Sequence, residues 1–283
     1  MSAKFGPGGN SDAFKLAGFS SSLDAPAWIA AQGLDAYEYE AGNGLSASPA
    51  MLRAIGKEAQ THNIKMSYHA PYFISLSGMD PEKRLKSVGY IKQSLDAAYC
   101  LGANVIVVHT GSAAKITRDE AMRLAADTLV HTLAEVDTHG VKIGLETMGK
   151  KNQLGTLDEV LELCRIDSAF VPVVDFGHMN ARECGCVFST SDDYMRVFDR
   201  IDRALGAEVA SNLHCHFSKI EWTSAGEKRH LTFEDSVYGP NPDPLIEAIV
   251  KNSLTPTIIS ESAGTQSDDA LYMKKLYEEL RSK

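Results

Sequence analysis

Histidine and acidic residues recur at the ends of short apolar segments along this chain. The segment PVVDFGHMN (172–180) carries an apolar run into Asp175 and places His178 three residues later. Other apolar runs end at residues of the same kinds, namely His69, His109, Glu146, His214 with His216, and Glu261. Imidazole nitrogens and carboxylate oxygens are the usual protein ligands of zinc and manganese. The pattern therefore indicates a divalent metal centre, provided that the fold brings these side chains together.

The apolar segments are predicted to be eight β-strands that alternate with helices. The strands are expected over residues 3–6, 34–40, 64–70, 104–109, 141–146, 170–175, 210–217 and 255–261. Helix starts are marked by Asp80-Pro81 and by the capping boxes Thr117-x-x-Glu120 and Thr156-x-x-Glu159. Eight such units in one chain predict an α/β fold, a single (β/α)8 TIM barrel that spans residues 1–283 as one domain. No GxGxxG or GxxxxGK(S/T) loop favours an open sheet instead.

A barrel would bring the polar strand ends together, because the carboxyl ends of its strands meet at one face. Carboxylates gathered there would repel one another unless a cation shared the site, so a metal cluster is the simplest neutralisation. Six of the nine histidines lie at these ends or in the loops after them, and the other three (His62, His131 and His139) fall on predicted helices, where we expect surface or helix-terminus roles.

The predicted ligand set is large enough for more than one ion. It comprises His69, His109, Glu146, Asp175, His178, His214, His230 and Glu261. A catalytic zinc takes about three protein ligands, so we expect two or three Zn²⁺ ions, with Mn²⁺ as an alternative metal and Glu146 as a bridge. Closely spaced ions suit phosphodiester hydrolysis, in which Glu146 and Glu261 would be the catalytic carboxylates. His216 shares a strand face with His214 and is expected to contact the cluster or the substrate.

Basic residues follow the same strand ends. They are Lys115, Arg118, Lys150, Lys151, Arg182, Lys219, Lys228 and Arg229. About half of them are expected to be ordinary loop residues. We predict substrate contacts for Lys115, Lys150, Arg182, Lys219 and Arg229, which would position a backbone phosphate without reading a sequence.

Composition limits the class of protein. Hydrophobic residues make up 44% and charged residues 23% of the chain, as in globular proteins, and the net charge of -9 argues against a generally basic nucleic-acid-binding surface. Five irregularly spaced cysteines favour a reducing compartment, and Cys184-Gly-Cys186 is only a weak zinc signal. No apolar run approaches a membrane span. We expect a cytoplasmic protein without a membrane partner, and a monomer is favoured.

Seven motifs resemble, in order and spacing, the zinc-dependent AP endonucleases of the endonuclease IV type. They are YHAPYFISL (68–76), VVHTGS (107–112), GLET (144–147), VDFGHMNA (174–181), LHCHFSK (213–219), KRH (228–230) and SES (260–262). This family belongs to the xylose-isomerase-like barrels. The resemblance implies a trinuclear zinc site, the eight ligands named above, and cleavage of damaged DNA on the 5′ side of abasic residues. Tyr72 matches an aromatic residue that this family inserts near the lesion.

The chain also departs from that family. The third zinc of the family uses Asp-Arg-His, whereas this chain has Lys228-Arg229-His230, with Glu227 adjacent. His216 stands where the family has asparagine, and the loop AGNGLSAS (41–48) lacks the arginine that would enter DNA. These differences affect damage recognition and the third metal position more than the other ligands.

Two other functions fit the same residues. A sugar isomerase or epimerase of this barrel class would hold one ion through Glu146, Asp175, His214 and Glu261. A non-catalytic binding protein is the third hypothesis, although so many ligands are unnecessary for binding alone. The number of ions per chain separates the two enzymatic hypotheses.

Overall fold

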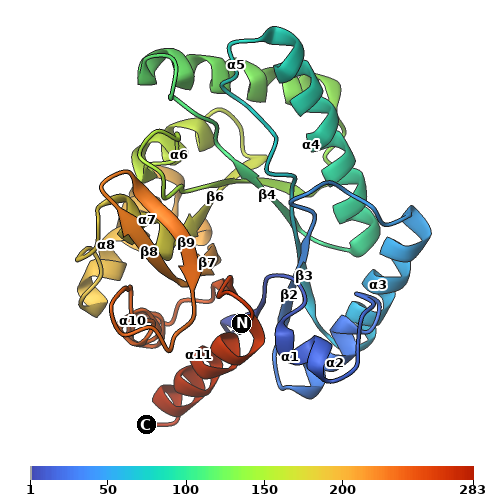
Figure 1. The fold of residues 1–283 in the computed structure, drawn as a ribbon, viewed down its shortest axis with the longest axis vertical. Coiled ribbons are helices and arrows are strands. Elements are labelled where there is room, and N and C mark those ends of the chain that lie inside the picture. The colour runs from blue at the N-terminus through green and yellow to red at the C-terminus, as the bar shows by residue number, and fades with distance from the viewer. Residues whose placement is uncertain (1) are drawn as a thin grey trace.

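A parallel barrel of eight strands forms the centre of the computed structural model, which describes residues 2–283. Its strands are β1 (Lys4–Pro7), β2 (Ala36–Glu40), β3 (Lys65–His69), β4 (Val105–His109), β5 (Lys142–Glu146), β6 (Phe170–Asp175), β7 (His214–Phe217) and β10 (Thr257–Ser260). They pair in the order β1-β10-β7-β6-β5-β4-β3-β2, and the helices surround them (Figure 1). The predicted (β/α)8 TIM barrel is confirmed.

The barrel closes where β1 meets β2. The backbone N–H of Asp35 donates to the carbonyl of Phe5 at 2.9 Å, and Gly8 forms a parallel bridge with Glu38. Gly6 permits this approach, because a Cβ at that position would lie only 1.8 Å from the carbonyl oxygen of Ala36. A glycine is therefore required at the closing seam.

Helices follow the strands of the barrel. They are α1 (Asp12–Leu16), α2 (Ala25–Ala31), α3 (Pro49–Thr61), α4 (Pro81–Leu101), α5 (Arg118–Glu135), α6 (Leu157–Cys164), α7 (Phe176–Arg182), α8 (Ser191–Leu205), α9 (Ala207–Ser211), α10 (Asp243–Lys251) and α11 (Gln266–Arg281). Of these, α4, α5 and α6 begin where Asp80-Pro81, Thr117 and Thr156 predict helix starts. Thr117 caps α5, and Thr156 with Glu159 forms a complete capping box on α6. Such caps satisfy backbone N–H groups that have no partner inside the helix.

Two regions differ from the sequence prediction. The seventh strand begins at His214 rather than residue 210, because the short helix α9 occupies the chain up to Ser211. An antiparallel hairpin of β8 (Lys219–Thr223) and β9 (Gly226–Leu231) follows β7 and was not predicted. This hairpin carries the loop residues that the sequence analysis grouped around His230.

Alternate residues of each strand face opposite sides of the barrel wall. Ile106 and Val108 of β4, for example, belong to the apolar core formed with the helices. Polar side chains occupy part of the barrel interior; Lys65 of β3, for example, reaches across it to donate to Thr257 of β10 at 2.8 Å.

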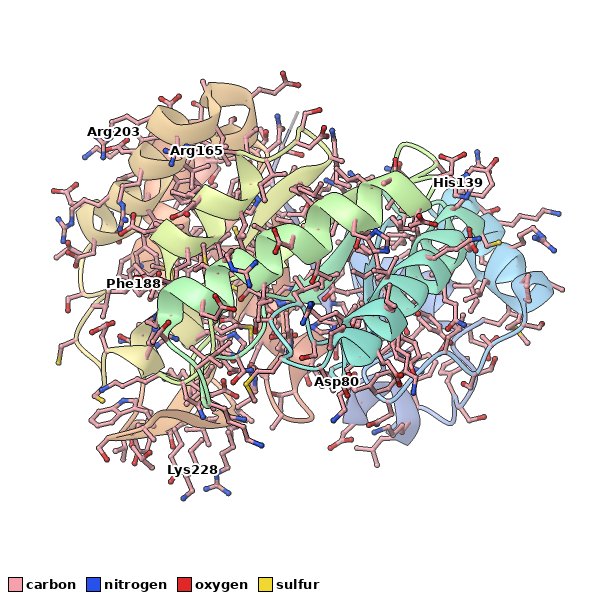
Figure 2. All side chains as sticks on the ribbon, turned by 90° about the horizontal axis from the view of Figure 1, so that it is seen from above. Asp80, His139, Arg165, Phe188, Arg203 and Lys228 are labelled. Atoms are coloured by element: carbon pink, nitrogen blue, oxygen red, sulfur yellow. The ribbon has the colours of Figure 1, made fainter. Side chains whose placement is uncertain are left out.

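The two ends of the barrel carry different loops. Asp80 lies in the segment after β3 and Lys228 in the hairpin after β7, and Figure 2 shows both toward one end of the molecule. His139 follows α5 and Arg165 follows α6, and both lie toward the other end. The polar strand ends described above therefore face the side of Asp80 and Lys228. Within residues 2–283, no helix is long and apolar enough to cross a membrane.

Candidate metal centre

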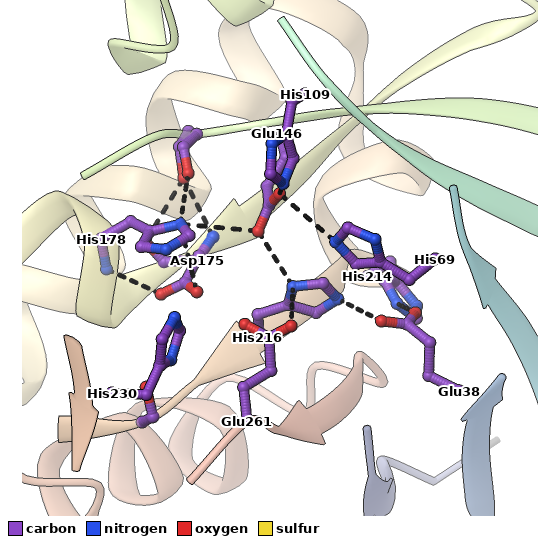
Figure 3. A network of polar contacts seen from close by, with 12 residues as sticks. Glu38, His69, His109, Glu146, Asp175, His178, His214, His216, His230 and Glu261 are labelled. Carbon is purple, nitrogen blue, oxygen red and sulfur yellow. Dashed lines mark hydrogen bonds and ion pairs between the residues drawn. The ribbon is translucent and has the colours of Figure 1, made fainter. Parts of the chain in front are cut away.

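Ligand-type side chains from six neighbouring strands meet at this mouth (Figure 3). Each of them is the last residue of its strand, lies near that end, or directly follows it, so the alternation of a parallel barrel directs all of them inward. They are His69 of β3, His109 of β4, Glu146 of β5, Asp175 of β6, His216 of β7, and Glu261 after β10. The convergence predicted from the strand ends is present in the structure.

Glu146 lies at the centre of this cluster and is fully buried. Its Oε2 is 3.2 Å from His109 Nε2 and 3.8 Å from His69 Nε2, and its Oε1 is 3.0 Å from His216 Nδ1. Burial by itself would raise the pKa of Glu146, but the surrounding histidines hold this pKa well below its usual range. A carboxylate kept ionised between imidazoles is suited to bridge two cations.

Five groups of side chains are compact enough to hold an ion, because the ligand atoms of each group all lie within 4.8 Å of one another; two of them include Glu38 of β2, and the other three surround Glu146 and His178. These three groups are His69, His109 and Glu146; then Glu146, Asp175, His216 and Glu261; and then His178, Glu227 and His230. Glu146 Oε2 and Asp175 Oδ2 are buried and accept no hydrogen bond. A buried carboxylate oxygen without a partner is costly, so the residues present fit divalent cations.

The histidines are also oriented as metal ligands are. His69 Nδ1 lies 2.9 Å from the carbonyl of Ala70, and His178 Nδ1 lies 3.0 Å from the carbonyl of Thr147. His230 Nδ1 lies 2.8 Å from the hydroxyl of Ser218. When a ring donates its Nδ1–H to such an oxygen, its Nε2 keeps the lone pair that binds a metal.

The third group contains Glu227, which is adjacent to the KRH motif in the sequence and is not one of the eight predicted ligands. His178 Nε2 lies 3.5 Å from Glu227 Oε2, whereas Lys228 Nζ points away and pairs with Glu221 at 2.6 Å. The cause is a β-bulge between β8 and β9, which pairs Trp222 with Glu227 and leaves Lys228 as the extra residue. In a regular strand, residue 228 would lie on the same face as His230. The bulge puts Glu227 on that face instead, so the third group gains a carboxylate.

His216, rather than the predicted His214, stands beside Asp175 and Glu261. The register pairs His216 with Asp175, whereas His214 pairs with Val173 and lies deeper in the barrel. His214 Nε2 is 2.9 Å from Glu38 Oε2 and belongs to none of the three ligand groups around Glu146 and His178. The sequence predicts His214 as a metal ligand and His216 as a contact of the cluster or the substrate. Both share one strand face, and the sequence does not specify the register between strands that separates them.

Two acidic residues of β2, the buried Glu38 and the partly exposed Glu40, lie near this mouth and are not among the predicted site residues. Glu38 is fully buried beside His214 and His216, and Glu40 lies near Tyr72 with its Oε2 3.5 Å from the tyrosine hydroxyl. Burial raises the pKa of Glu40 to about 7. The segment YEYE at the end of the second strand carries the same signal that identified the other strands, namely acidic residues at alternate positions near the strand end.

Burial and the neighbouring charges shift the pKa values of residues in this cluster. Burial would lower the pKa of His69, but Glu40 and Glu146 raise it to about 10. Burial raises the pKa of Asp175 to about 7. Imidazoles must lose their protons before they bind a metal, so ion binding at this mouth would release protons.

A cavity of about 460 Å³ opens over these ligands. Tyr72 and Lys150 line it together with the metal-ligand candidates, and the Tyr72 ring packs against both His69 and His109, with ring centroids 5.1 and 5.3 Å away. An adjoining cavity of about 470 Å³ contains Glu40 and shares Tyr72, His230 and Glu261 with the first. The predicted substrate contacts Tyr72 and Lys150 therefore face the candidate metal centre.

The other predicted basic contacts lie elsewhere. Arg182 is buried and donates to the carbonyls of Met148, Lys150, Lys151 and Gln153, and buried Lys219 donates to the carbonyls of Phe233 and Asp235. Arg229 pairs with Glu221, and exposed Lys115 does not line either cavity. Arg182 and Lys219 thus hold loops in place, because a buried cation must be satisfied by acceptors.

Comparison with known proteins places the chain in a family. Residues 26–280 match the model of the xylose isomerase-like TIM barrel. An uncharacterized protein of Methanocaldococcus jannaschii is 30% identical over 77% of this chain and 78% of its own length. A probable endonuclease 4 of Acholeplasma laidlawii is 29% identical over 70% of this chain and 72% of its own. The crystal structure of a D-tagatose 3-epimerase-like protein superposes with a TM-score of 0.70 at 19% identity, covering 99% and 98% of the two chains, which shows the shared fold alone. The chain belongs to the xylose isomerase-like TIM barrel family.

Proposed function

We propose that this protein is a metal-dependent phosphodiesterase that holds two or three divalent ions, Zn²⁺ in the first place, and cleaves DNA on the 5′ side of abasic residues. The observation that carries this proposal is the set of three adjacent ligand groups, two of which share Glu146. A single-ion enzyme needs only one such group. Similarity to a probable endonuclease 4 over 70% of the chain supports the choice of substrate.

The residues at the mouth would divide the work. Bound ions would activate a water and stabilise the leaving oxygen of the phosphodiester. Glu146 would join the first two ion positions, and Glu261 would complete the second beside Asp175 and His216. Lys150 is the basic residue of the cavity and would contact a substrate phosphate. Tyr72, whose side chain is 52% exposed, would stack against the sugar or base next to the scissile bond.

An incision assay tests the proposal. Purified protein with Zn²⁺ or Mn²⁺ is incubated with a duplex that contains one abasic residue and with the same duplex without it. We expect incision of the abasic duplex, loss of incision in Glu261→Gln, and retention in the matched control Glu221→Gln, whose carboxylate pairs with Lys228 and Arg229 outside the cavity. Wild-type incision no greater than that of Glu261→Gln would refute the proposal.

A second candidate function is a sugar isomerase or epimerase with one ion. The group of Glu146, Asp175, His216 and Glu261 alone offers four ligands to one ion, and the fold likeness to a D-tagatose 3-epimerase-like protein supports this candidate. The adjoining cavity contains Asn43, Ser46 and Gln266, and among residues 2–283 no lysine or arginine lines it, so it suits hydroxyl groups better than phosphates. One ion per chain, together with turnover of a ketohexose, would favour this function over DNA cleavage.

A further inference from the structure

Glu38 is a buried carboxylate that none of the roles above uses. It lies on β2, two residues before Glu40, and its side chain points into the barrel below the candidate metal centre (Figure 3). Its Oε1 lies 2.8 Å from His216 Nε2, and its Oε2 lies 2.9 Å from His214 Nε2. One carboxylate of β2 therefore contacts two histidines of β7, a strand that pairs with β10 and β6 and not with β2.

His216 is held between this carboxylate and the ligand group. Its Nδ1 lies 3.0 Å from Glu146 Oε1 and 3.4 Å from Glu261 Oε1, so one ring nitrogen faces the ligand group while the other faces Glu38. A neutral imidazole carries one proton, and only the nitrogen without it can bind a cation. For His216 to serve as a ligand through Nδ1, the proton must stay on Nε2.

We propose that Glu38 is a positioning residue that retains the proton of His216 on Nε2 and thereby presents Nδ1 to an ion held with Glu146, Asp175 and Glu261. This inference rests on the metal centre of the proposed function, but not on its substrate. Glu38 Oε1 and His216 Nε2 lie 2.8 Å apart without the alignment of a linear hydrogen bond, so the negative charge of the carboxylate, rather than a well-aligned acceptor, would favour the proton on Nε2. Its charge is therefore the property to test.

The surroundings fix Glu38 in this position. The hydrogen bond from His214 Nε2 occupies its second oxygen, so the carboxylate cannot turn toward the mouth without losing a buried partner. The backbone at Glu38 is held at the closing seam, where its carbonyl accepts the N–H of Gly9 at 3.0 Å. Other histidines of the centre use neutral oxygens for the same purpose, namely the Ala70 carbonyl for His69 and the Thr147 carbonyl for His178. A carboxylate in that role makes the imidazole a stronger ligand.

The same three side chains also form a compact group that could hold an ion themselves, since their ligand atoms lie within 4.8 Å of one another. In that case Glu38 would be a ligand and not a positioning residue. The two roles differ in the number of ions that the chain binds, and the experiment below separates them.

The test measures metal affinity in variants of the full chain. Glu38→Gln keeps the shape and removes the charge, and Glu38→Ala removes both. Asp35→Asn is the matched control, because Asp35 precedes the same strand but pairs with Lys274 at the opposite end of the barrel. Zn²⁺ is titrated in competition with a chromophoric chelator, and the ions per chain are counted by elemental analysis.

We expect one ion per chain to bind roughly 10- to 100-fold more weakly in both Glu38 variants, with the other ions and Asp35→Asn unchanged. In a His216→Gln background the effect of Glu38→Gln should disappear, because the two residues act through one contact. This non-additivity is a result that a merely structural role of Glu38 would not produce. It also remains measurable if Glu38→Ala does not fold.

Three results would overturn the inference. The first is an affinity within twofold of wild type in Glu38→Gln, and the second is an additive effect in the double variant. The third is a wild-type chain that binds one ion more than Glu38→Gln at saturating Zn²⁺, since Glu38 would then be a ligand. A wild-type chain that binds no divalent ion would refute this inference and the proposed function together. Bound ions without incision of abasic DNA would refute only the substrate.

Discussion

Replacement of Glu227 by glutamine is the most direct test of the third ion position. The carboxylate of Glu227 lies beside His178 and His230 because a β-bulge displaces Lys228 from that face. Glutamine has nearly the same shape but is a much poorer metal ligand, so Glu227→Gln should leave the hairpin intact. We expect it to weaken one ion per chain while the two ions that share Glu146 remain bound.

The size of the effect follows from the number of ligands. Structural zinc sites with four ligands bind with roughly 10–16 kcal/mol at neutral pH, or about 2.5–4 kcal/mol per ligand. One factor of ten in affinity corresponds to about 1.4 kcal/mol, so the loss of one ligand should weaken the ion by about 10²- to 10³-fold. The group of His178, Glu227 and His230 has only three protein ligands, so no fourth side chain compensates.

The assay is a competition titration with Zn²⁺, with elemental analysis after equilibration at fixed free metal. Lys228→Met is the matched control, because Lys228 is the neighbouring residue, is largely exposed and pairs only with Glu221. It should bind as many ions as wild type with the same affinity. The reasoning would be refuted if Glu227→Gln kept the wild-type affinity, or if Lys228→Met lost the ion instead.

Three further predictions concern stability. Arg182→Met should lower the free energy of unfolding by about 3 kcal/mol in chemical denaturation, because four loop carbonyls lose a charged donor, whereas exposed Arg229→Met should change it by less than about 0.5 kcal/mol. Burial raises the pKa of Glu159, but the Thr156 and Gly155 N–H groups and Arg118 lower this pKa below its usual value. The ionised carboxylate therefore stabilises the fold at a pH above its unfolded-state pKa. In denaturation curves measured from pH 6 to 3, the stability difference between wild type and Glu159→Gln should shrink as the pH falls below about 4.5. Chelation of bound ions should lower the midpoint of thermal unfolding by roughly 5–10 °C, because a ligand present at about 100 times its Kd contributes about 2.7 kcal/mol of stability. Addition of Zn²⁺ should restore the midpoint. Equal midpoints with and without chelator would contradict an ion site in the folded chain.

The sequence by itself determined the barrel and the types of side chain that gather at its mouth. Alternating strand and helix signals are local, and the end of each strand can be read from a few neighbouring residues. Because parallel strands all end at one face, residues such as His69, Glu146 and Asp175 could be assigned to one site without any knowledge of contacts. The same rule holds for Glu38 and Glu40, which lie near the end of the second strand.

The tertiary structure decided which of the neighbouring candidates face that site. The β-bulge selects Glu227 over Lys228, and the register of β7 sets His216 beside Asp175 while His214 turns to Glu38. Packing of the loops buries Arg182 and Lys219 against backbone carbonyls and leaves Lys150 at the cavity. Register, bulges and burial depend on contacts between segments that are distant in sequence, so the spacing of residues along one strand or loop does not determine them.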